Sequence, residues 1–311
     1  MEYNTAILMA VHNGQKFLAE QIESILQQTY ANFDLIIQDD GSTDDSMKII
    51  NDYCQKDKRV VKISFLKENK GAVANFSSLF NYAKDIYDYI FFSDQDDVWD
   101  MNKVKNSMEE IKKYDNFPAL VFTNFYLWKS DTLKKIYEKK VKYSFERCIS
   151  QNVMYGCTMM VNKKMIDIID NIPLCVENHD YWIALLATLN DSSIIYLEQP
   201  MLKHRLHEEN VTARSSSGTF KGRVKALIEG PLSNDYVNNK FQMWINLYDE
   251  LAKRYNEKQI CNLNVLIQSY GFFDALRCIR IGFKGVSIRG TLFFFLTILL
   301  RRRINYGKNK I

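Results

Sequence analysis

The first 130 residues alternate between two hydrophobic patterns. Short apolar runs, typical of strands buried on both faces, are separated by segments whose apolar residues recur at helical spacing. The expected strands are Thr5–Val11, Phe33–Gln38, Val60–Leu66 and Tyr89–Ser93. The expected helices run from Gln15 to about Gln28, from just after Asp44, and from about Ala72 to Asp85. This alternation predicts parallel β-α-β units, and therefore an α/β fold with helices on both faces of its sheet.

The rest of the chain is predicted to change character twice. Between Pro118 and Pro200 it is mixed, and from Thr219 onward helical periodicity dominates. The mixed section has expected strands at Leu120–Leu127 and Gly156–Val161, and an expected helix at Asn178–Leu189 with Asn178 as its N-cap. We therefore expect a catalytic or binding domain over residues 1–215 and a helical region over 216–311.

Composition narrows the class of protein. The chain has 311 residues, 47% of them hydrophobic and 25% charged, which excludes disordered and low-complexity classes. Its six cysteines are scattered, without zinc or disulfide spacing. The beginning of the sequence lacks the pattern of a signal peptide, so a cytoplasmic location is expected.

Charge is distributed unevenly. The formal net charge is +4, but the segment from Gly271 to the end carries six Arg and three Lys against one acid, Asp274. A basic tail on a mildly acidic body predicts an anionic partner for the tail. The apolar run Leu292–Leu300 within it is too short to span a bilayer, and cations frame it. This pattern favours a helix lying at the surface of an anionic membrane, or else a core helix docked on the domain.

The most informative chemistry lies at the expected strand ends. His12-Asn13-Gly14-Gln15 follows the first strand, and neither G-x-G-x-x-G nor a P-loop occurs, which disfavours dehydrogenases and P-loop NTPases. Acids follow two other strands, in Asp39-Asp40-Gly41-Ser42-Thr43-Asp44 and Asp94-Gln95-Asp96-Asp97. The carboxyl ends of such strands border the ligand crevice of α/β sheets.

Clustered acids at that edge predict a divalent cation and a donor-rich ligand. Mg²⁺ or Mn²⁺ is held by one or two carboxylates together with substrate phosphates. An ionised carboxylate such as Asp40 accepts hydrogen bonds only, so it suits the N–H of uracil, thymine or guanine. The simpler alternatives are a polar turn with a helix cap at residues 39–44 and an acidic surface turn at residues 94–97.

These motifs resemble those of family 2 glycosyltransferases with the GT-A fold. The resemblance covers about residues 3–212 and rests on V-x-N, Q-T-Y, D-D-G-S-T-D and a later D-x-D-D. S-D-Q-D-D-V-W, G-C-T-M and H-D-Y-W are similar to bacterial rhamnosyltransferase-like members that build surface polysaccharides. The resemblance implies a Rossmann-like mixed sheet with helices on both faces, followed here by a helical, basic C-terminal extension.

The resemblance also implies roles for individual residues. The side chains that would border the nucleotide sugar are Ala10, His12, Asp40, Lys70, Asn75 and Asp94. Asp96 would be the main ligand of a Mn²⁺ or Mg²⁺ ion. His207, within His204-Arg205-Leu206-His207-Glu208-Glu209-Asn210, would complete that metal site or contact the diphosphate.

Asp180 corresponds to the general base of inverting members. Its alternative is an acid that stabilises the first turn of a helix through the helix dipole. At the usual Asp pKa near 3.9, such a base would be ionised at neutral pH. Trp99 is read as a core aromatic rather than a pocket wall.

The function implied is metal-dependent, inverting transfer of a sugar, with rhamnose a candidate, in the synthesis of a surface polysaccharide. The implied donor is a dTDP- or UDP-linked sugar, and the acceptor is a glycan or polyprenyl-linked saccharide at the inner face of the cell membrane. No nucleic-acid partner is expected. A metal-dependent nucleotidyltransferase or phosphohydrolase, and a non-catalytic module that binds sugar nucleotides within a membrane assembly, stay open as alternatives.

Overall fold

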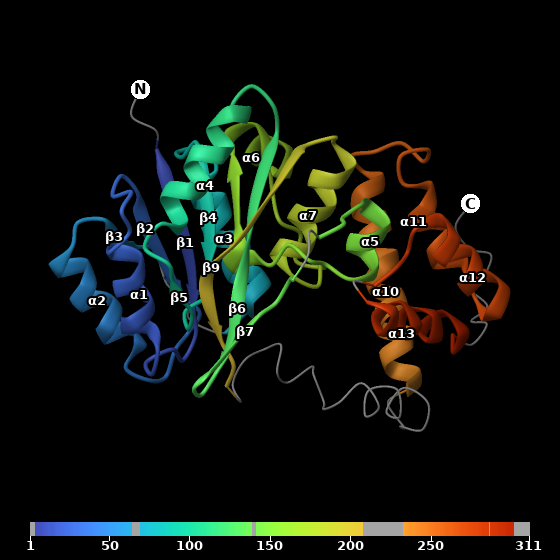
Figure 1. Cartoon of the computed structure of the whole chain (residues 1–311), viewed down its shortest axis with the longest axis horizontal. Helices are drawn as coiled ribbons and strands as arrows, with labels where there is room; N and C mark the ends of the chain where they lie inside the picture. The colour runs from blue at the N-terminus through green and yellow to red at the C-terminus, as the bar shows by residue number, and fades with distance from the viewer. Residues whose placement is uncertain (1–3, 64–68, 139–140, 208–232, 286, 302–311) are drawn as a thin grey trace. The chain divides into compact units, whose positions relative to one another are not determined.

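The structure, a computed structural model, describes residues 4–63, 69–138, 141–207, 233–285 and 287–301 (Figure 1). The chain divides into two compact units. Unit 1 comprises Met1–Lys142 and Asn152–Asn210, and unit 2 comprises Tyr143–Gln151 and Val211–Ile311. The expected boundary at residue 215 lies outside the described residues. The sequence pattern gave no sign that residues 143–151 would join the second unit.

Unit 1 is built on one mixed sheet. In the described part of the chain this sheet has nine strands, in the order β3-β2-β1-β4-β8-β6-β9-β5, with β7 paired to β6. Their bounds are β1 Thr5–Val11, β2 Asp34–Asp39, β3 Val60–Lys62, β4 Tyr89–Ser93, β5 Val98–Trp99, β6 Ala119–Lys129, β7 Thr132–Lys135, β8 Met159–Asn162 and β9 Ser193–Arg205. The first four strands are parallel, and β8 joins both β4 and β6 in antiparallel pairs.

Apolar side chains on both faces place β1 and β2 in the core of unit 1. Ala6–Met9 of β1 and Leu35–Ile37 of β2 are almost wholly buried. Such continuous burial is typical of parallel strands covered by helices on both sides. The register pairs Val11 with Asp39 and Met9 with Ser93, so the carboxyl ends of β1, β2 and β4 meet at one edge.

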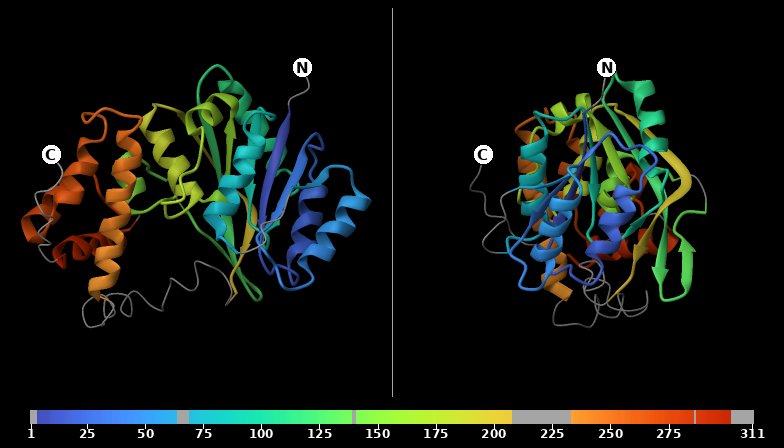
Figure 2. Two further views of the ribbon diagram at one scale, coloured as in Figure 1. Left: turned by 180° about the vertical axis from the view of Figure 1, so that it is seen from behind. Right: turned by 90° about the vertical axis from the view of Figure 1, so that its left-hand side faces the viewer.

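The helices of unit 1 cover both faces of this sheet, as expected. They are α1 Leu18–Leu26, α2 Ser46–Lys56, α3 Ala72–Ala83, α4 Lys103–Ile111, α6 Lys163–Ile169 and α7 His179–Leu189. Figure 1 shows α4 on the near face of the sheet, and the back view in Figure 2 shows α3 on the opposite face. The expected helices that begin near Gln15, Asp44 and Ala72 correspond to α1, α2 and α3.

Several expected boundaries differ from the structure. The first and fourth expected strands match β1 and β4 residue for residue, but β3 ends at Lys62, and residues 64–68 lie outside the described part. Gly156–Thr158 forms a 3-10 turn in which the Thr158 N–H donates to the Tyr155 carbonyl, so the strand expected from Gly156 begins only at Met159. Asn178 does precede α7, although its side chain makes no capping hydrogen bond.

Unit 2 is helical in its described residues. Its helices are α5 Phe145–Ser150, α10 Ser233–Ala252, α11 Cys261–Gln268, α12 Gly271–Ile281 and α13 Ile288–Leu299. Aromatic side chains fill its core, where Phe294 packs on Trp244 and Phe283 at ring-centroid separations of 5.8 and 5.9 Å. No helix in the described ranges is long and apolar enough to cross a membrane.

Arg301 corrects one reading of the sequence. It was expected to belong to a cationic group framing the apolar run Leu292–Leu300, yet it is only 9% exposed. Its guanidinium donates to the carbonyl oxygen of Ser269 at 2.9 Å and lies 3.9 Å from the Phe241 ring centroid. A cation at the carbonyl end of a helix is favourable, so Arg301 closes the end of α11.

Candidate active site

Asp39 and Asp40, at the end of β2 and the start of the following turn, make different contacts. Asp39 accepts hydrogen bonds from the N–H and the hydroxyl of Ser42, at 2.9 and 2.5 Å, and thereby holds its own turn. Gly41, at a φ of 73°, supplies the left-handed conformation that the turn requires. Asp44 accepts from the Ser46 N–H at 3.0 Å, just where α2 begins. The motif is therefore partly the polar turn that the sequence left open as an alternative.

Asp40 points to a different environment. Its two carboxylate oxygens accept the backbone N–H groups of Lys70 and Gly71, at 2.9 and 2.8 Å. The residue is 2% exposed. Because an ionised carboxylate has about four acceptor positions, Asp40 retains the capacity to accept a further N–H. Lys70 contributes its main chain here, and its side chain is exposed.

His12 has a defined tautomer beside Asp40. Its Nε2 lies 2.9 Å from the Asn69 amide nitrogen and 3.3 Å from that of Asn13. Both amides are oriented by backbone donors, since Asn69 Oδ1 accepts from Gly71 and Asn13 Oδ1 accepts from Thr43. Nε2 is therefore an acceptor, and Nδ1–H donates to the Asp40 carbonyl oxygen at 3.0 Å.

Gln95 ties the end of β1 to the acidic turn after β4. Its Oε1 accepts the His12 N–H at 2.8 Å, and its Nε2 donates to the His12 carbonyl at 2.9 Å. A Cβ on Gly14 would lie 2.5 Å from Gln95 Oε1, so glycine makes room for this clamp. The sequence named the acids of Asp94-Gln95-Asp96-Asp97 and missed Gln95, because its partner lies 83 residues away.

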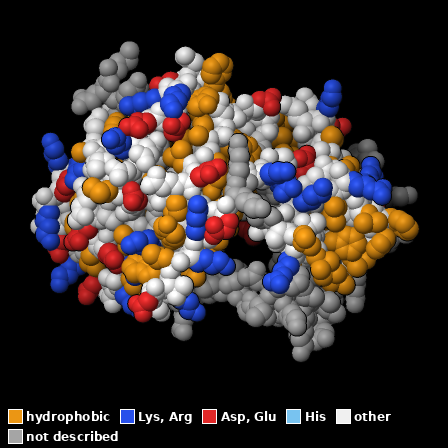
Figure 3. All heavy atoms as spheres, viewed as in Figure 1, with side chains coloured by type: hydrophobic (Ala, Val, Ile, Leu, Met, Phe, Trp, Pro, Cys, Tyr) orange, Lys and Arg blue, Asp and Glu red, His pale blue; other side chains and the backbone are white. Residues whose placement is uncertain are grey.

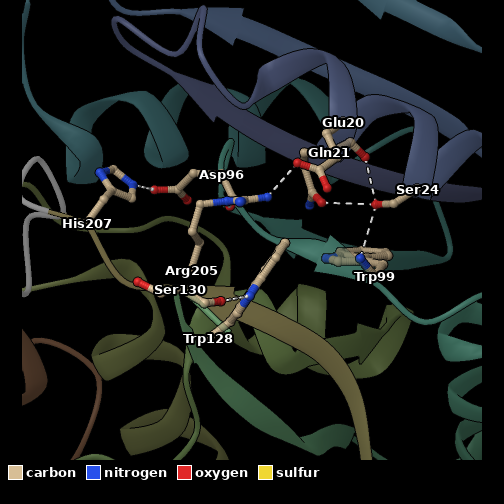
Figure 4. Close-up of polar contacts among 9 residues, drawn as sticks. All are labelled: Glu20, Gln21, Ser24, Asp96, Trp99, Trp128, Ser130, Arg205 and His207. Carbon is tan, nitrogen blue, oxygen red and sulfur yellow. Dashed lines mark hydrogen bonds and ion pairs between the residues drawn. The ribbon is translucent and has the colours of Figure 1, made fainter. Parts of the chain in front are cut away.

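Asp96 and His207 come together, as the resemblance implied. His207 Nε2 lies 2.7 Å from Asp96 Oδ2, and Figure 4 shows the imidazole pointing at the carboxylate. Arg205 holds the acidic turn from the same strand end, because its Nε donates to the Asp96 carbonyl at 3.1 Å. Its guanidinium lies 4.4 Å from the Phe17 ring centroid and 4.1 Å from that of Trp128, and it pairs with Glu20. Asn210 of the same motif lies outside the described residues.

A second group of polar side chains lies behind this pair. Ligand atoms of Asp94, Asp97, Cys157 and His204 all lie within 4.8 Å of one another. Asp97 is fully buried, and its Oδ1 lies 2.8 Å from Nδ1 of His204, with which it forms an ion pair. Burial alone would lower the pKa of His204, but the Asp97 carboxylate outweighs it and raises that pKa to about 9. Asp97 and Cys157 are buried, whereas Asp94 and His204 are half-buried, so we interpret the Asp97–His204 pair as a support of the acidic turn.

The acids of the turn raise one another's pKa. Burial raises the pKa of Asp94 to about 7, and the charges of Asp97, Asp96 and Asp180 add to that rise. Burial and the charge of Asp97 also raise the pKa of Asp96. Crowded carboxylates of this kind are relieved by a cation. The Asp96 carboxylate is the kind of oxygen ligand that Mn²⁺ and Mg²⁺ prefer, and the imidazole of His207 lies 2.7 Å from it.

Asp180 lies in the first turn of α7. Its Oδ2 accepts the Gly156 N–H at 3.0 Å. Burial raises its pKa to about 6, although the hydrogen bonds from Gly156 and Tyr181 oppose the rise. The usual pKa near 3.9 that the sequence analysis used is therefore too low, because the fold removes part of the solvent around this carboxylate. Its charge acts on Asp94, so the two acids share one electrostatic environment.

Two predicted residues border the site differently. Asn75 is 1% exposed and donates to the Gln38 carbonyl at 3.1 Å, which fastens α3 to β2. Ala10 is half-buried near the end of β1, where it pairs with Gln38. Trp99 is 4% exposed, as expected of a core aromatic, and the Lys103 ammonium lies 3.4 Å from its ring centroid.

This chain matches the family described as glycosyl transferase family 2 over residues 6–169, more than half of its length, and it belongs to that family. It is 28% identical over 240 residues to dTDP-rhamnosyl transferase RfbG of Shigella flexneri, covering 70% of this chain and 78% of that protein. It is 25% identical to the Escherichia coli UDP-Glc:alpha-D-GlcNAc-diphosphoundecaprenol beta-1,3-glucosyltransferase WfgD, covering 76% of this chain and 90% of that protein.

Solved structures place the fold. TarS 1–349 of S. aureus in complex with UDP-GlcNAc superposes with a TM-score of 0.61 at 16% identity, covering 85% of this chain and 71% of that one. The mannosyltransferase PcManGT of Pyrobaculum calidifontis, with GDP-Man and Mn²⁺, gives a TM-score of 0.52 at 10% identity, covering 96% and 86%. The protein is a family 2 glycosyltransferase with the GT-A fold, an enzyme class that uses nucleotide-sugar donors.

Proposed function

We propose that the protein is an inverting, metal-dependent glycosyltransferase that moves a hexose, with rhamnose the first candidate, from a dTDP- or UDP-linked donor to a polyprenyl-linked glycan. The product serves the synthesis of a surface polysaccharide at the inner face of the cell membrane. The similarity to RfbG supports the rhamnosyl donor, and the similarity to WfgD supports the lipid-linked acceptor.

One observation carries the proposal. Asp180 accepts the Gly156 N–H at 3.0 Å, and the next residue of that turn, Cys157, has its Sγ within 4.8 Å of the Asp94 carboxylate, at the start of the acidic turn. Glycosyl transfer needs a general base and a metal-binding turn close to each other. The base activates the acceptor on one side of the anomeric carbon, and the diphosphate leaves from the other side.

The donor side is argued from Asp40 and His12. Asp40 has unused acceptor capacity, and the imide N–H of uracil or thymine is a matching donor. His12 presents a neutral imidazole held by Asn69 and by the Asp40 carbonyl, which suits it to lie along a base. His12 and Asp40 directly follow the paired strands β1 and β2. In parallel sheets, nucleotides bind in the crevice at the carboxyl ends of the strands.

The chemical step is a single displacement. The Asp180 carboxylate takes the proton of the acceptor hydroxyl while that oxygen bonds to the anomeric carbon of the sugar. The bond between this carbon and the diphosphate oxygen breaks with its electron pair, so the configuration inverts. The Gly156 N–H fixes Oδ2 of Asp180 during the step. A pKa of about 6 makes Asp180 a stronger base than an exposed Asp while leaving it ionised at pH 7.

Asp96 and His207 would hold the cation, which would neutralise charge on the leaving diphosphate. Arg205 keeps the acidic turn in place by binding the Asp96 carbonyl. Asp97 and His204 support the same turn from behind through their buried ion pair. These contacts fix the carboxylates before the donor binds, which reduces the reorganisation that the reaction requires.

Three measurements test the proposal together. Thermal shifts with dTDP, UDP and GDP, with and without Mn²⁺, identify the nucleotide, and slow donor hydrolysis with Mn²⁺ reports the chemistry. Asp180→Asn should abolish turnover and keep nucleotide binding. Hydrolysis that survives both Asp96→Asn and EDTA would overturn the metal assignment. Nucleotide binding without any turnover on donor and lipid-linked acceptors would instead favour the non-catalytic module.

A further inference from the structure

Two helices of unit 2 expose a group of large apolar side chains. We call this group the α12–α13 patch, and its members are Phe272, Phe273, Ile288, Leu292 and Phe295. Phe273 is 84% exposed and Ile288 is 89% exposed. Phe272 joins the two helices, since its ring lies 5.7 Å from the ring of Phe273 and 5.6 Å from that of Phe295. The patch is therefore continuous across both helices.

The patch includes only one face of α13. Phe294 and Ile298 on the other side of the helix are buried in the core of unit 2. The apolar run Leu292–Leu300, expected either at a membrane or in the core, is therefore partly core, and its other face is exposed. The part of it that stays exposed is extended by the aromatic pair of α12, which the sequence analysis did not single out.

Cations border the patch. Arg277, Arg280 and Arg289 are exposed on the same two helices, and Figure 3 shows Lys and Arg side chains at the edges of the apolar surface over α12 and α13. Asp274 is the only acid on these helices, and its carboxylate accepts the Tyr270 N–H at 3.0 Å. The surface therefore combines apolar area with net positive charge.

A hollow of about 520 Å³ opens beside the patch, within unit 2. Its apolar walls include Ile279, Leu292 and Phe295, and its cationic walls are Arg147 of α5 and Lys284 of the α12–α13 turn. An anionic head group with an adjoining apolar chain matches this combination, because the cations suit its phosphate and the walls suit the chain.

We propose that the α12–α13 patch lies on a membrane surface that contains anionic phospholipid, with one lipid phosphate taken between Arg147 and Lys284. This deepens the proposed function, on which it rests, by naming the surface that holds the enzyme beside its lipid-linked acceptor. Apolar side chains inserted at the acyl boundary and cations at the head groups are the two requirements for such binding.

Charge argues against the other obvious occupant, a second copy of this chain. A two-fold contact through the patch would bring Arg277, Arg280 and Arg289 of both copies together, and like charges across an interface are unfavourable. An anionic bilayer meets the same arginines with opposite charge. The proposal therefore commits to lipid, and self-association becomes an outcome of the test.

The test is sedimentation of the full chain with vesicles. Vesicles of phosphatidylglycerol and phosphatidylcholine should carry the protein down, and vesicles of phosphatidylcholine alone should do so far less. The double variant Phe273→Ser, Ile288→Ser should bind about tenfold more weakly, and so should Arg280→Glu, Arg289→Glu. These four side chains are exposed, so the variants should keep the fold, which circular dichroism checks.

Matched controls lie in unit 1. Phe117 is 64% exposed and Lys48 is exposed, so Phe117→Ser and Lys48→Glu remove similar groups from elsewhere and should leave vesicle binding unchanged. Lys284→Met should weaken binding to anionic vesicles and leave the residual binding to phosphatidylcholine unaltered. Inorganic phosphate at millimolar concentration should not compete if the apolar chain contributes.

Two results would overturn the inference. One is vesicle binding that is absent, or equal in the patch variants and their controls. The other is a dimer in light scattering that the patch variants dissociate, which would assign the surface to self-association. Donor hydrolysis in solution is measured on the same samples. Lost vesicle binding with intact hydrolysis removes only this inference, whereas absent hydrolysis in the unaltered protein removes the proposed function.

Discussion

The backbone N–H of Gly156 donates to Oδ2 of Asp180 at 3.0 Å. The same glycine faces the ring of His179, the residue that precedes Asp180 in α7. A Cβ at position 156 would collide with His179 Nε2. That imidazole is held in turn, because it stacks on Phe76 at a ring-centroid distance of 3.8 Å. One glycine thus positions the carboxylate of α7 and leaves room for the side chain that anchors the helix.

Replacing Gly156 by alanine should therefore harm both stability and activity. The added methyl group must displace His179 from a packed core, which typically costs about 1–3 kcal/mol of unfolding free energy. The carboxylate of Asp180 moves with the helix, so the initial rate of transfer should fall by about tenfold or more. Urea titration and initial rates with a fixed donor measure the two effects.

A double-mutant cycle tests whether the collision of the added methyl group with His179 causes the loss of stability in Gly156→Ala. His179→Ala alone leaves a cavity and lowers stability, but it also removes the group that the new methyl would meet. The loss caused by Gly156→Ala should be smaller in that background, as neighbouring sites are not additive. Equal losses in the two backgrounds would show that the contact does not explain the effect.

The pKa of Asp180 predicts a pH profile. The base acts when ionised, so kcat should rise with pH and reach half of its plateau near pH 6, where burial places the pKa. An exposed Asp would give a profile that is flat from about pH 5 upward. The rates are measured at saturating donor and Mn²⁺, because the raised pKa values of Asp94 and Asp96 make nucleotide affinity itself depend on pH. A flat kcat from pH 5 to 8 would contradict the assignment.

The same shift predicts that Asp180 lowers stability at neutral pH. The folded pKa lies above the unfolded one, so the folded state binds more protons and stability falls as pH rises from about 4 to 6. Asp180→Asn should reduce this slope, leaving the part due to Asp94 and Asp96, and increase the free energy of unfolding at pH 7 by roughly 2–3 kcal/mol. A variant that is inactive and more stable would fit a functional carboxylate.

Mn²⁺ should stabilise the protein by a mechanism that requires Asp96. A ligand at one hundred times its dissociation constant adds about 2.7 kcal/mol to the unfolding free energy. Asp96→Asn should remove most of the Mn²⁺-dependent rise in Tm, and His207→Ala should reduce it. Asp52→Asn changes an exposed acid of α2 and should keep the full rise. An undiminished rise in Asp96→Asn would place the ion elsewhere.

Lys103 predicts the opposite pH trend. It is completely buried, and burial lowers its pKa from 10.5 to about 7. The unfolded state therefore binds more protons between pH 7 and 10, and this residue makes stability rise with pH across that window. Lys103→Met keeps most of the packing against Trp99 and should remove the rise. Urea titrations of both proteins at pH 7 and 9.5 provide the difference.

Local pattern was enough to predict the strands that carry the acids. Thr5–Val11 and Tyr89–Ser93 are continuous apolar runs, and their burial on both faces follows from composition alone. Asp40 and Asp96 were found because acids directly follow a strand, whereas Asp180 was reached through the resemblance. The pairing of Asp96 with His207, 111 residues apart, was reached through the resemblance rather than through the pattern.

The contacts that shape the site were not predictable in this way. Gln95 and Gly156 lie within motifs that carried the resemblance, but their roles depend on partners that only the folded chain brings near. The pKa of Asp180 was misjudged for the same reason, since burial depends on what packs over the carboxylate. The short strand β5 also escaped notice, because two residues carry no periodicity.

The amide of Gln95 grips both the N–H and the C=O of His12, much as a neighbouring strand would. Gln95 thereby joins the loop after β1, which we propose to face the nucleobase, to the turn that carries Asp94 and Asp96. Efforts to alter donor preference at position 12 can exchange the imidazole, but they must preserve its main chain, or the diphosphate end of the pocket will shift as well.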